Sequence, residues 1–222
     1  MTTLPRGRFV VLEGTDGAGT TTQGDLLAAH LRACGLQVVR TAQPSELDGG
    51  QLIRRILRGE IRDGDRSIDP AAVALLFAAD RVDHGRRVVE PALQRGAWVV
   101  CDRHLGSSLA FQVSDGQAAG LAVDPAWVLA INRHALQADL SLWLDVPVAV
   151  AIERIAARGK PLERFETEAM LTRVRDRYAA LCADPPAVLG RVVRIDASAA
   201  QPTVACAIRQ SLDDVFGRPE SR

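Results

Sequence analysis

Short runs rich in valine and leucine alternate along the chain with longer segments that contain many alanine, leucine and charged residues. Short apolar runs of this kind predict β-strands, and the longer segments predict helices. We expect five strands, at residues 8–12, 36–41, 97–102, 140–146 and 191–196. Since strands that alternate with helices form parallel sheets, the pattern predicts an α/β fold with a five-stranded parallel sheet covered by helices on both faces.

Helices are predicted where apolar residues recur every three or four positions between these strands. The predicted helices cover residues 20–34, 70–96, 107–112, 125–137, 147–159, 165–182 and 201–216. Asp69 followed by Pro70 is typical of a helix start, and Gly35 is typical of the residue after a helix. Two polar segments, residues 43–50 and 158–166, interrupt the alternation. Since loops after the strands of α/β sheets hold ligands and lids, we expect both segments beside a ligand site.

Length and composition are those of one globular domain, which we expect to cover residues 1–222. A formal net charge of zero gives no sign of a surface for nucleic acid. The longest apolar run, residues 71–79, is too short to span a membrane. No apolar signal segment precedes the first strand, and the four cysteines are scattered. We therefore expect a cytoplasmic protein with reduced cysteines that binds neither nucleic acid nor membrane.

A glycine-rich stretch, EGTDGAGTTTQ at residues 13–23, joins the first predicted strand to the first predicted helix. It matches the phosphate-binding pattern G-x-x-x-x-G-K-[ST] at Gly14, Gly19 and Thr21. Glycines let the backbone turn tightly, so that N–H groups and the positive end of the helix face a phosphate. The loop at residues 14–21 is the candidate phosphate site, and its candidate residues are Gly14, Asp16, Gly17, Ala18, Gly19, Thr20, Thr21 and Thr22.

Thr20 stands where the pattern has its lysine. That lysine normally offsets phosphate charge during transfer of a phosphoryl group. Threonine donates a hydrogen bond but carries no charge, so we expect binding to survive better than turnover. Loss of one well-placed electrostatic group costs about 10²–10³-fold in rate.

Asp102 and Arg103 follow one another at the end of the predicted strand at residues 97–102. An acid at this end of a strand, beside a phosphate loop, can hold Mg²⁺ or orient a phosphate. Asp102 and Thr21 are therefore the candidate Mg²⁺ ligands, and the planar fork of Arg103 suits a phosphate. An exposed salt bridge at the strand end is the alternative interpretation.

Several segments together resemble bacterial thymidylate kinases, over nearly the whole length of the chain. They are FVVLEGTDGAGTTTQ, LLFAADR, GAWVVCDRHLGSSLAFQ, ADLSLWLDVP, ARGKPLERFE and VVRIDAS, in that order. The resemblance implies a P-loop nucleoside-monophosphate-kinase fold with a short lid at about residues 158–166. It also implies transfer of a phosphoryl group from ATP to dTMP with Mg²⁺, in a protein that often forms homodimers.

The same resemblance implies which residues bind dTMP: Asp16, near the sugar, and Phe77, Arg81, Arg103, Ser108 and Gln112. Phe77 would stack on thymine and Arg81 would hydrogen-bond the edge of the base. Ser108 and Gln112 would complete the base pocket, and Arg103 would bind the phosphate. Without the resemblance, the alternative interpretations are a core residue for Phe77 and part of a solvated helix face for Arg81.

Two departures from the family pattern concern phosphate handling. Besides Thr20, Ala42 stands where the family has an arginine near the acceptor phosphate, within Ala-Gln-Pro-Ser-Glu. The segment that is rich in glycine and arginine in the family is here Val-Ser-Asp-Gly-Gln, at residues 113–117. The catalytic candidates are Asp102, Arg103 and three cations of the predicted lid that replace the missing charge, namely Arg158, Lys160 and Arg164. Lys160 is the only lysine of the chain.

Three functions remain open from the sequence. The first is a working dTMP kinase in which a lid cation replaces the lysine of the loop. The second is a catalytically silent nucleotide-binding homologue with a regulatory role. The third is a kinase for another nucleoside monophosphate. A GTPase is disfavoured because the chain has no N-K-x-D motif.

Overall fold

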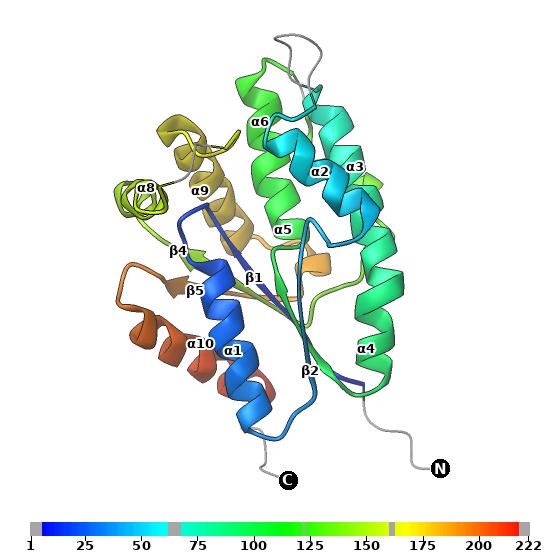
Figure 1. The fold of residues 1–222 in the computed structure, drawn as a ribbon, viewed down its shortest axis with the longest axis vertical. Helices are drawn as coiled ribbons and strands as arrows, with labels where there is room; N and C mark the ends of the chain where they lie inside the picture. The colour runs from blue at the N-terminus through cyan, green and yellow to red at the C-terminus, as the bar shows by residue number, and fades with distance from the viewer. Residues whose placement is uncertain (1–5, 62–67, 122, 160–162, 218–222) are drawn as a thin grey trace.

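The computed structural model describes residues 6–61, 68–121, 123–159 and 163–217. Within these ranges all five strands run parallel in one sheet, in the order β2-β3-β1-β4-β5 (Figure 1). Their bounds are β1 Phe9–Gly14, β2 Val38–Ala42, β3 Trp98–Asp102, β4 Leu140–Asp145 and β5 Arg191–Asp196. The predicted parallel sheet is confirmed.

Helices surround the sheet, and each predicted helix is present; the one at residues 201–216 has the predicted bounds, and the bounds of the others differ. The α-helices are α1 Thr20–Ala33, α2 Asp48–Leu57, α3 Pro70–His84, α4 Glu90–Gln94, α5 Leu105–Ser107, α6 Val113–Ala118, α7 Pro125–Ile131, α8 Val148–Ala156, α9 Glu168–Ala183 and α10 Gln201–Phe216. The π-helical turn η1, Gly85–Val89, joins α3 to α4, and the π-helical turn η2, Ser108–Gln112, joins α5 to α6. A short 3₁₀ turn, η3, covers Ala187–Leu189.

The two faces of the sheet are covered by different helices, because successive residues of a strand point to opposite sides. Val10 and Leu12 of β1 pack in one cluster with residues of α1 and α10. Phe9 and Val11 pack in a second cluster with residues of η1 and α4. In Figure 1, α1 and α10 accordingly lie on one side of the sheet, and α3 and α4 on the other.

Helix α2 was not predicted, since residues 43–50 were expected to be a polar loop. The prediction was wrong from Asp48 onward. The loop was expected because the segment is polar. The helix start also contains Gly50, which serves a close contact: a Cβ there would lie 2.0 Å from the carbonyl oxygen of Ser45. Ile53 and Ile56 of α2 pack against Val73 and Phe77 of α3, so this helix helps to position Phe77.

The carboxyl ends of β1, β2 and β3 lie side by side, since Leu12 and Ala42 are both in register with Asp102. The glycine-rich loop follows β1 and leads into α1. In the described part of the chain, no helix combines the length and the apolar character that a membrane span requires.

Candidate functional site

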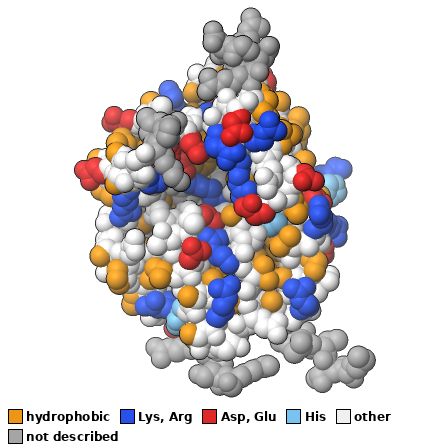
Figure 2. All heavy atoms as spheres, in the orientation of Figure 1, with side chains coloured by type: hydrophobic (Ala, Val, Ile, Leu, Met, Phe, Trp, Pro, Cys, Tyr) orange, Lys and Arg blue, Asp and Glu red, His pale blue; other side chains and the backbone are white. Residues whose placement is uncertain are grey.

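Two adjoining cavities open at this edge of the sheet. The first has a volume of about 600 Å³ and is called here the arginine-rich cavity. The basic residues that line it are Arg40, Arg54, Arg58, Arg81, Arg103 and Arg164. The second, of about 640 Å³, is lined by residues 15–23 and is called the loop cavity. Figure 2 shows basic side chains gathered around a hollow on this face. Asp16, Thr21 and Arg103 line both cavities, so they form the junction between them.

The glycine-rich loop has the backbone conformation that a phosphate cradle requires. Gly17 has φ +81°, and a Cβ there would lie 2.5 Å from the carbonyl oxygen of Ala151. Gly19 has φ +88° and precedes α1 without a side-chain cap. The N-terminus of α1 therefore offers uncapped N–H groups and its positive dipole end to the loop cavity, which is an arrangement that binds phosphate.

The predicted phosphate-binding residues lie together, with one exception. Those that line the loop cavity are Asp16, Gly17, Ala18, Gly19, Thr20, Thr21 and Thr22. Gly14 lies beneath the loop, where a Cβ would be 2.8 Å from the carbonyl oxygen of Leu144. The side chain of Thr20 is turned toward Gly14, and only 5% of this residue is exposed. The cations that the structure does bring to this cavity are Arg103, Arg154 and Arg158.

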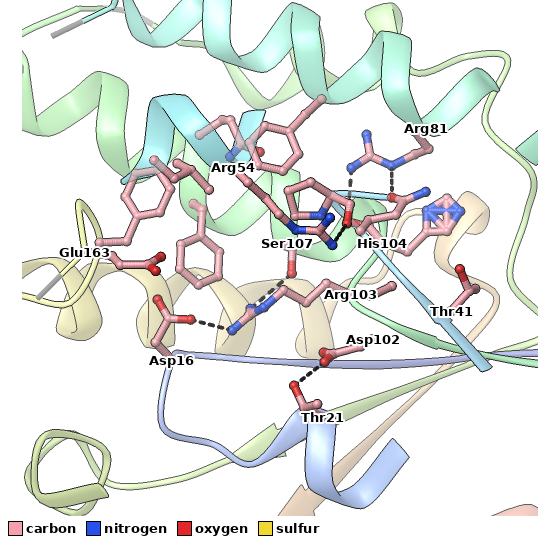
Figure 3. A pocket seen from close by; sticks show the side chains of 18 of the residues that line it. Asp16, Thr21, Thr41, Arg54, Arg81, Asp102, Arg103, His104, Ser107 and Glu163 are labelled. Atoms are coloured by element: carbon pink, nitrogen blue, oxygen red, sulfur yellow. Dashed lines mark hydrogen bonds and ion pairs between the residues drawn. The ribbon is translucent and has the colours of Figure 1, made fainter. Parts of the chain in front are cut away.

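Thr21 and Asp102 meet at the junction of the two cavities (Figure 3). The hydroxyl of Thr21 donates a hydrogen bond to Oδ2 of Asp102. Oδ1 of Asp102 is buried and has no hydrogen-bond partner among the described residues. Mg²⁺ prefers oxygen ligands and often binds through one or two protein groups together with substrate phosphates. A hydroxyl and a carboxylate with an unpartnered oxygen therefore fit this ion.

Arg103 extends between the cavities from a strained backbone position. Its φ of +67° is the only positive value for a non-glycine residue among those described. Nη2 lies 2.8 Å from Oδ1 of Asp16, and Nη1 donates hydrogen bonds to the carbonyl oxygen of Gly14 and the hydroxyl of Ser107. The guanidinium carbon lies 4.8 Å from the ring centre of Phe111. Burial lowers the pKa of Arg103, but Asp16 and the other nearby acidic groups outweigh it and raise the pKa.

A buried carboxylate supports the segment that carries Arg103. Oε2 of Glu13 accepts hydrogen bonds from Ser107 Oγ at 2.6 Å and from the Tyr178 hydroxyl at 3.0 Å. Oε1 accepts one from the backbone N–H of His104 at 3.0 Å. Burial raises the pKa of Glu13, although these hydrogen bonds and Arg103 oppose the shift. Tyr178, to which the sequence assigned no role, thus helps to hold the turn after β3.

The four residues expected around the base lie in one region. Phe77, Arg81 and Gln112 line the arginine-rich cavity, and Ser108 accepts a hydrogen bond from Arg81 Nη2 at 2.7 Å. Arg81 is only 1% exposed, so it does not belong to a solvated helix face. Its other donors reach Gln43, Asn132 and the carbonyl oxygen of His104, and burial lowers its pKa to about 10. Gln112 has a buried amide oxygen without a partner among the described residues.

Other residues of this cavity were missed by the sequence analysis, among them Arg40, Arg54, Phe111 and Glu163. Arg54 projects from α2 and donates to the carbonyl oxygens of Ser45 and Pro44 at 2.8 and 2.6 Å. The helix that carries Arg54 could have been predicted, because Ile53 and Ile56 on either side of it recur at helical spacing. Phe111 was inside a predicted helix, but nothing local showed that it would lie under Arg103.

The lid cations separate into two places. Arg158 lines the loop cavity and pairs with Glu166 at 3.1 Å. Arg164 lines the arginine-rich cavity instead and pairs with Asp115 at 2.7 Å. Lys160 lies outside the described residues. The structure therefore brings Arg158, and not Arg164, to the cavity of the glycine-rich loop.

Comparison with known proteins gives consistent matches. A family model described as thymidylate kinase matches residues 12–204. A probable thymidylate kinase of Pyrococcus abyssi is 45% identical over 177 residues, which are 79% of this chain and 83% of that protein. A thymidylate kinase of Rhizorhabdus wittichii is 41% identical over 214 residues, 95% of this chain and 99% of that protein. One of Alkalilimnicola ehrlichii is 38% identical over 218 residues, 97% and 96% of the two chains.

Proposed function

The chain belongs to the thymidylate kinase family, and we propose that it transfers the γ-phosphoryl group of ATP to the phosphate of dTMP, giving dTDP and ADP. The observation that carries this proposal is the junction formed by Asp16, Thr21 and Arg103, which line both cavities. ATP binds with its phosphates in the loop cavity, and dTMP binds in the arginine-rich cavity. Their phosphates then meet at the junction.

The attacking group in this reaction is a phosphate oxygen of dTMP, so the protein needs no strong base. Catalysis rests on alignment and on stabilisation of charge. The N–H groups at the start of α1 hold the donor phosphates. Arg103, held by Asp16 and by the carbonyl oxygen of Gly14, offers its fork to the phosphate of dTMP. Its fixed position means that little reorganisation is needed during transfer.

Thr21 and Asp102 hold Mg²⁺ in this proposal, since the unpartnered oxygen of Asp102 suits a cation. When bound, the ion neutralises charge on the transferring phosphoryl group. The hydrogen bond from Thr21 orients the carboxylate of Asp102 at the junction. This arrangement keeps both oxygen donors beside the phosphates.

Selection of thymine rests on Phe77, Arg81 and Gln112, which line the arginine-rich cavity, and on Ser108, which accepts a hydrogen bond from Arg81. Phe77 stacks on the ring, and the unpartnered oxygen of Gln112 accepts a hydrogen bond from the N3–H group of thymine. Arg81 and Ser108 fix the wall behind the base. Cytosine has no N–H at N3, so it would leave Gln112 unpaired. A site with such a group discriminates strongly against the analogue that lacks the matching donor.

The experiment that tests this function compares acceptors. ADP release with ATP and Mg²⁺ is measured for dTMP, dUMP, dCMP and dGMP at equal concentrations. The proposal expects the highest kcat/KM for dTMP and much the lowest for dCMP and dGMP. Equal or greater turnover with another acceptor would reassign the enzyme to that nucleotide.

We propose that residues 1–222 form a single domain with a lid at residues 158–166. Because Thr20 carries no charge, we also propose that a cation of this lid replaces the charge of the missing lysine. Arg158 already lines the loop cavity. Lys160 and Arg164 are the other candidates of this segment. Lys160→Ala should lower kcat if Lys160 replaces the missing charge, and an unchanged kcat would leave Arg158 and Arg164 as the candidates.

A silent nucleotide-binding homologue is the second candidate function, and Thr20 is the observation that favours it. The side chain at this position carries no charge and is turned toward Gly14. This alternative expects the natural protein to bind ATP without dTMP-dependent release of ADP. Thr20→Lys would then restore turnover in an otherwise intact site.

We also propose that the protein is of the bacterial type, cytoplasmic and homodimeric. The similarity to the Rhizorhabdus and Alkalilimnicola proteins, over 95% and 97% of the chain, supports the bacterial type. The four cysteines are all unpaired, as suits a reducing compartment. A shallow hollow on α3 includes Leu75, which is 50% exposed, and it is a candidate surface for a second copy. Analytical ultracentrifugation of Leu75→Glu tests that contact.

A further inference from the structure

Arg40, in the middle of β2, reaches the junction of the two cavities. Arg40 is in register with Val100 of β3, and Ala42 is in register with Asp102. Yet Nη2 of Arg40 lies 3.6 Å from Oδ2 of Asp102 and donates to the carbonyl oxygen of Thr21 at 3.2 Å. The guanidinium therefore extends forward along the sheet to the level of Ala42, which carries no polar side chain of its own.

The guanidinium of Arg40 is held by hydrogen bonds, but not all of its N–H groups have an acceptor. Nε donates to Asp25 at 2.9 Å, Nη1 donates to the carbonyl oxygen of Thr41, and Nη2 donates to Thr21. An arginine side chain has five N–H groups. One N–H of Nη1 and one of Nη2 therefore have no acceptor at hydrogen-bond distance among the described residues, and Nη2 also lies within ion-pair distance, 3.6 Å, of Oδ2 of Asp102. The side chain is 17% exposed, and it lines the arginine-rich cavity.

Gly24 of α1 provides the space that this position requires. A Cβ at Gly24 would lie 2.8 Å from Cζ and Nη2 of Arg40, and 2.9 Å from Nε. Real Cβ atoms essentially never approach other atoms so closely, so any other residue at position 24 would push the guanidinium away. Gly24 lies within a helix, where glycine is less favourable than alanine. The room made for Arg40 offsets that cost.

We propose that Arg40 binds the phosphate of the acceptor nucleotide and that Gly24 is the residue that makes this contact possible. The inference rests on the proposed function, which places the acceptor in the arginine-rich cavity. Arg40 lines that cavity and is not among the described residues that line the loop cavity. Two N–H groups without a hydrogen-bond acceptor, on a planar fork, match the oxygens of a phosphate. Asp25 and Asp102 fix the fork in position.

The test measures binding of dTMP and of thymidine, each without ATP, by isothermal titration calorimetry. The two ligands differ only in the phosphate, so the ratio of their dissociation constants reports the phosphate contact. Arg40→Met should raise the dissociation constant of dTMP, and with it the dTMP-to-thymidine ratio, about tenfold to a hundredfold, as expected for loss of hydrogen bonds to a charged group. Thymidine affinity should be unchanged. Arg32→Met, an exposed arginine of α1 outside both cavities, is the matched control.

Gly24→Ala provides an independent variant that leaves Arg40 in the sequence. It should weaken dTMP binding selectively, and the double variant should lose no more than Arg40→Met alone. A dTMP-to-thymidine ratio that neither variant changes would overturn the inference. So would a loss of ATP affinity in place of dTMP affinity, since the contacted phosphate would then be that of the donor. If the natural protein binds neither dTMP nor thymidine, the proposed function itself fails.

Discussion

Arg103 and Asp16 form an ion pair of 2.8 Å at the point where the two cavities meet. Asp16 comes from the loop after β1 and Arg103 follows the end of β3, so the pair joins two strand ends at the junction of the cavities. Figure 3 shows the Arg103 side chain extending toward Asp16, with Thr21 and Asp102 nearby. In this account the pair aims the guanidinium at the phosphate of the acceptor.

Two replacements of Arg103 should separate the contribution of its charge to kcat/KM from the contribution of its planar fork. Arg103→Met removes both and should lower kcat/KM for dTMP by about 10²–10³-fold. Arg103→Lys keeps the charge but loses the planar fork, so it should recover only part of the loss. Steady-state kinetics with dTMP as the varied substrate checks this. If the lysine and methionine variants were equally active, or if both matched the natural protein, Arg103 would not bind phosphate in the way proposed.

The backbone of Arg103 gives a stability prediction. Its φ of +67° is unfavourable for any residue with a Cβ. Arg103→Ala and Arg103→Gly remove the same side-chain contacts and differ only in the Cβ. The glycine variant should therefore be the more stable by about 1–2 kcal/mol. Urea unfolding of the two variants measures this difference. An alanine variant as stable as the glycine variant would mean that the turn relaxes once the arginine is gone.

The Mg²⁺ requirement should depend on the hydroxyl of Thr21. Thr21→Val keeps the shape of the side chain and removes the oxygen, whereas Thr21→Ser keeps the oxygen. The valine variant should need at least about tenfold more Mg²⁺ for half-maximal activity, and the serine variant should resemble the natural protein. Chelation with EDTA should stop ADP release in all three. Identical Mg²⁺ titration curves for valine and serine would remove Thr21 from the metal site.

Acid should destabilise the protein through His104. The ring is 5% exposed, its Nδ1 has no partner among the described residues, and burial, with Arg81 and His84, holds its pKa well below 6.5. Because the folded state binds fewer protons than the unfolded state, the contribution of His104 is present above pH 6.5 and is lost as the pH falls through the folded pKa. The loss is at most about 1.4 kcal/mol per pH unit.

His104→Phe should flatten this dependence while it keeps the aromatic contact with Phe9. His84, whose pKa burial also lowers, is present in both proteins, so part of the pH dependence remains in the variant. The free energy of unfolding, measured in urea between pH 7.5 and 5, should fall less steeply for the variant. Parallel curves would show that His104 is protonated with little cost in the folded state.

The sequence predicted the strands and the loop of this site because those features are local. The run FVVL followed by glycines and threonines identifies β1, the turn and the start of α1 without any knowledge of distant residues. Asp102 and Arg103 were predictable for the same reason, since an acid and a base end an apolar strand. Parallel pairing then brings these segments together.

The parts that could not be predicted depend on contacts between distant segments. Arg164 was expected among the cations near ATP, but its partner is Asp115, 49 residues away, and that contact brings it to the other cavity. Arg40 and Gly24 lie on different elements, and nothing in either local pattern connects them. Helix α2 was hidden because one of its glycines, Gly50, serves a close contact with Ser45.

The most direct test of the central claim is chromatographic detection of dTDP after the natural protein is incubated with ATP, Mg²⁺ and dTMP, beside Thr20→Lys. We predict that the natural protein forms dTDP in amounts that match the ADP released. Absence of dTDP from the natural protein, with product from Thr20→Lys, would contradict that claim and identify a nucleotide-binding protein whose chemistry is lost at Thr20.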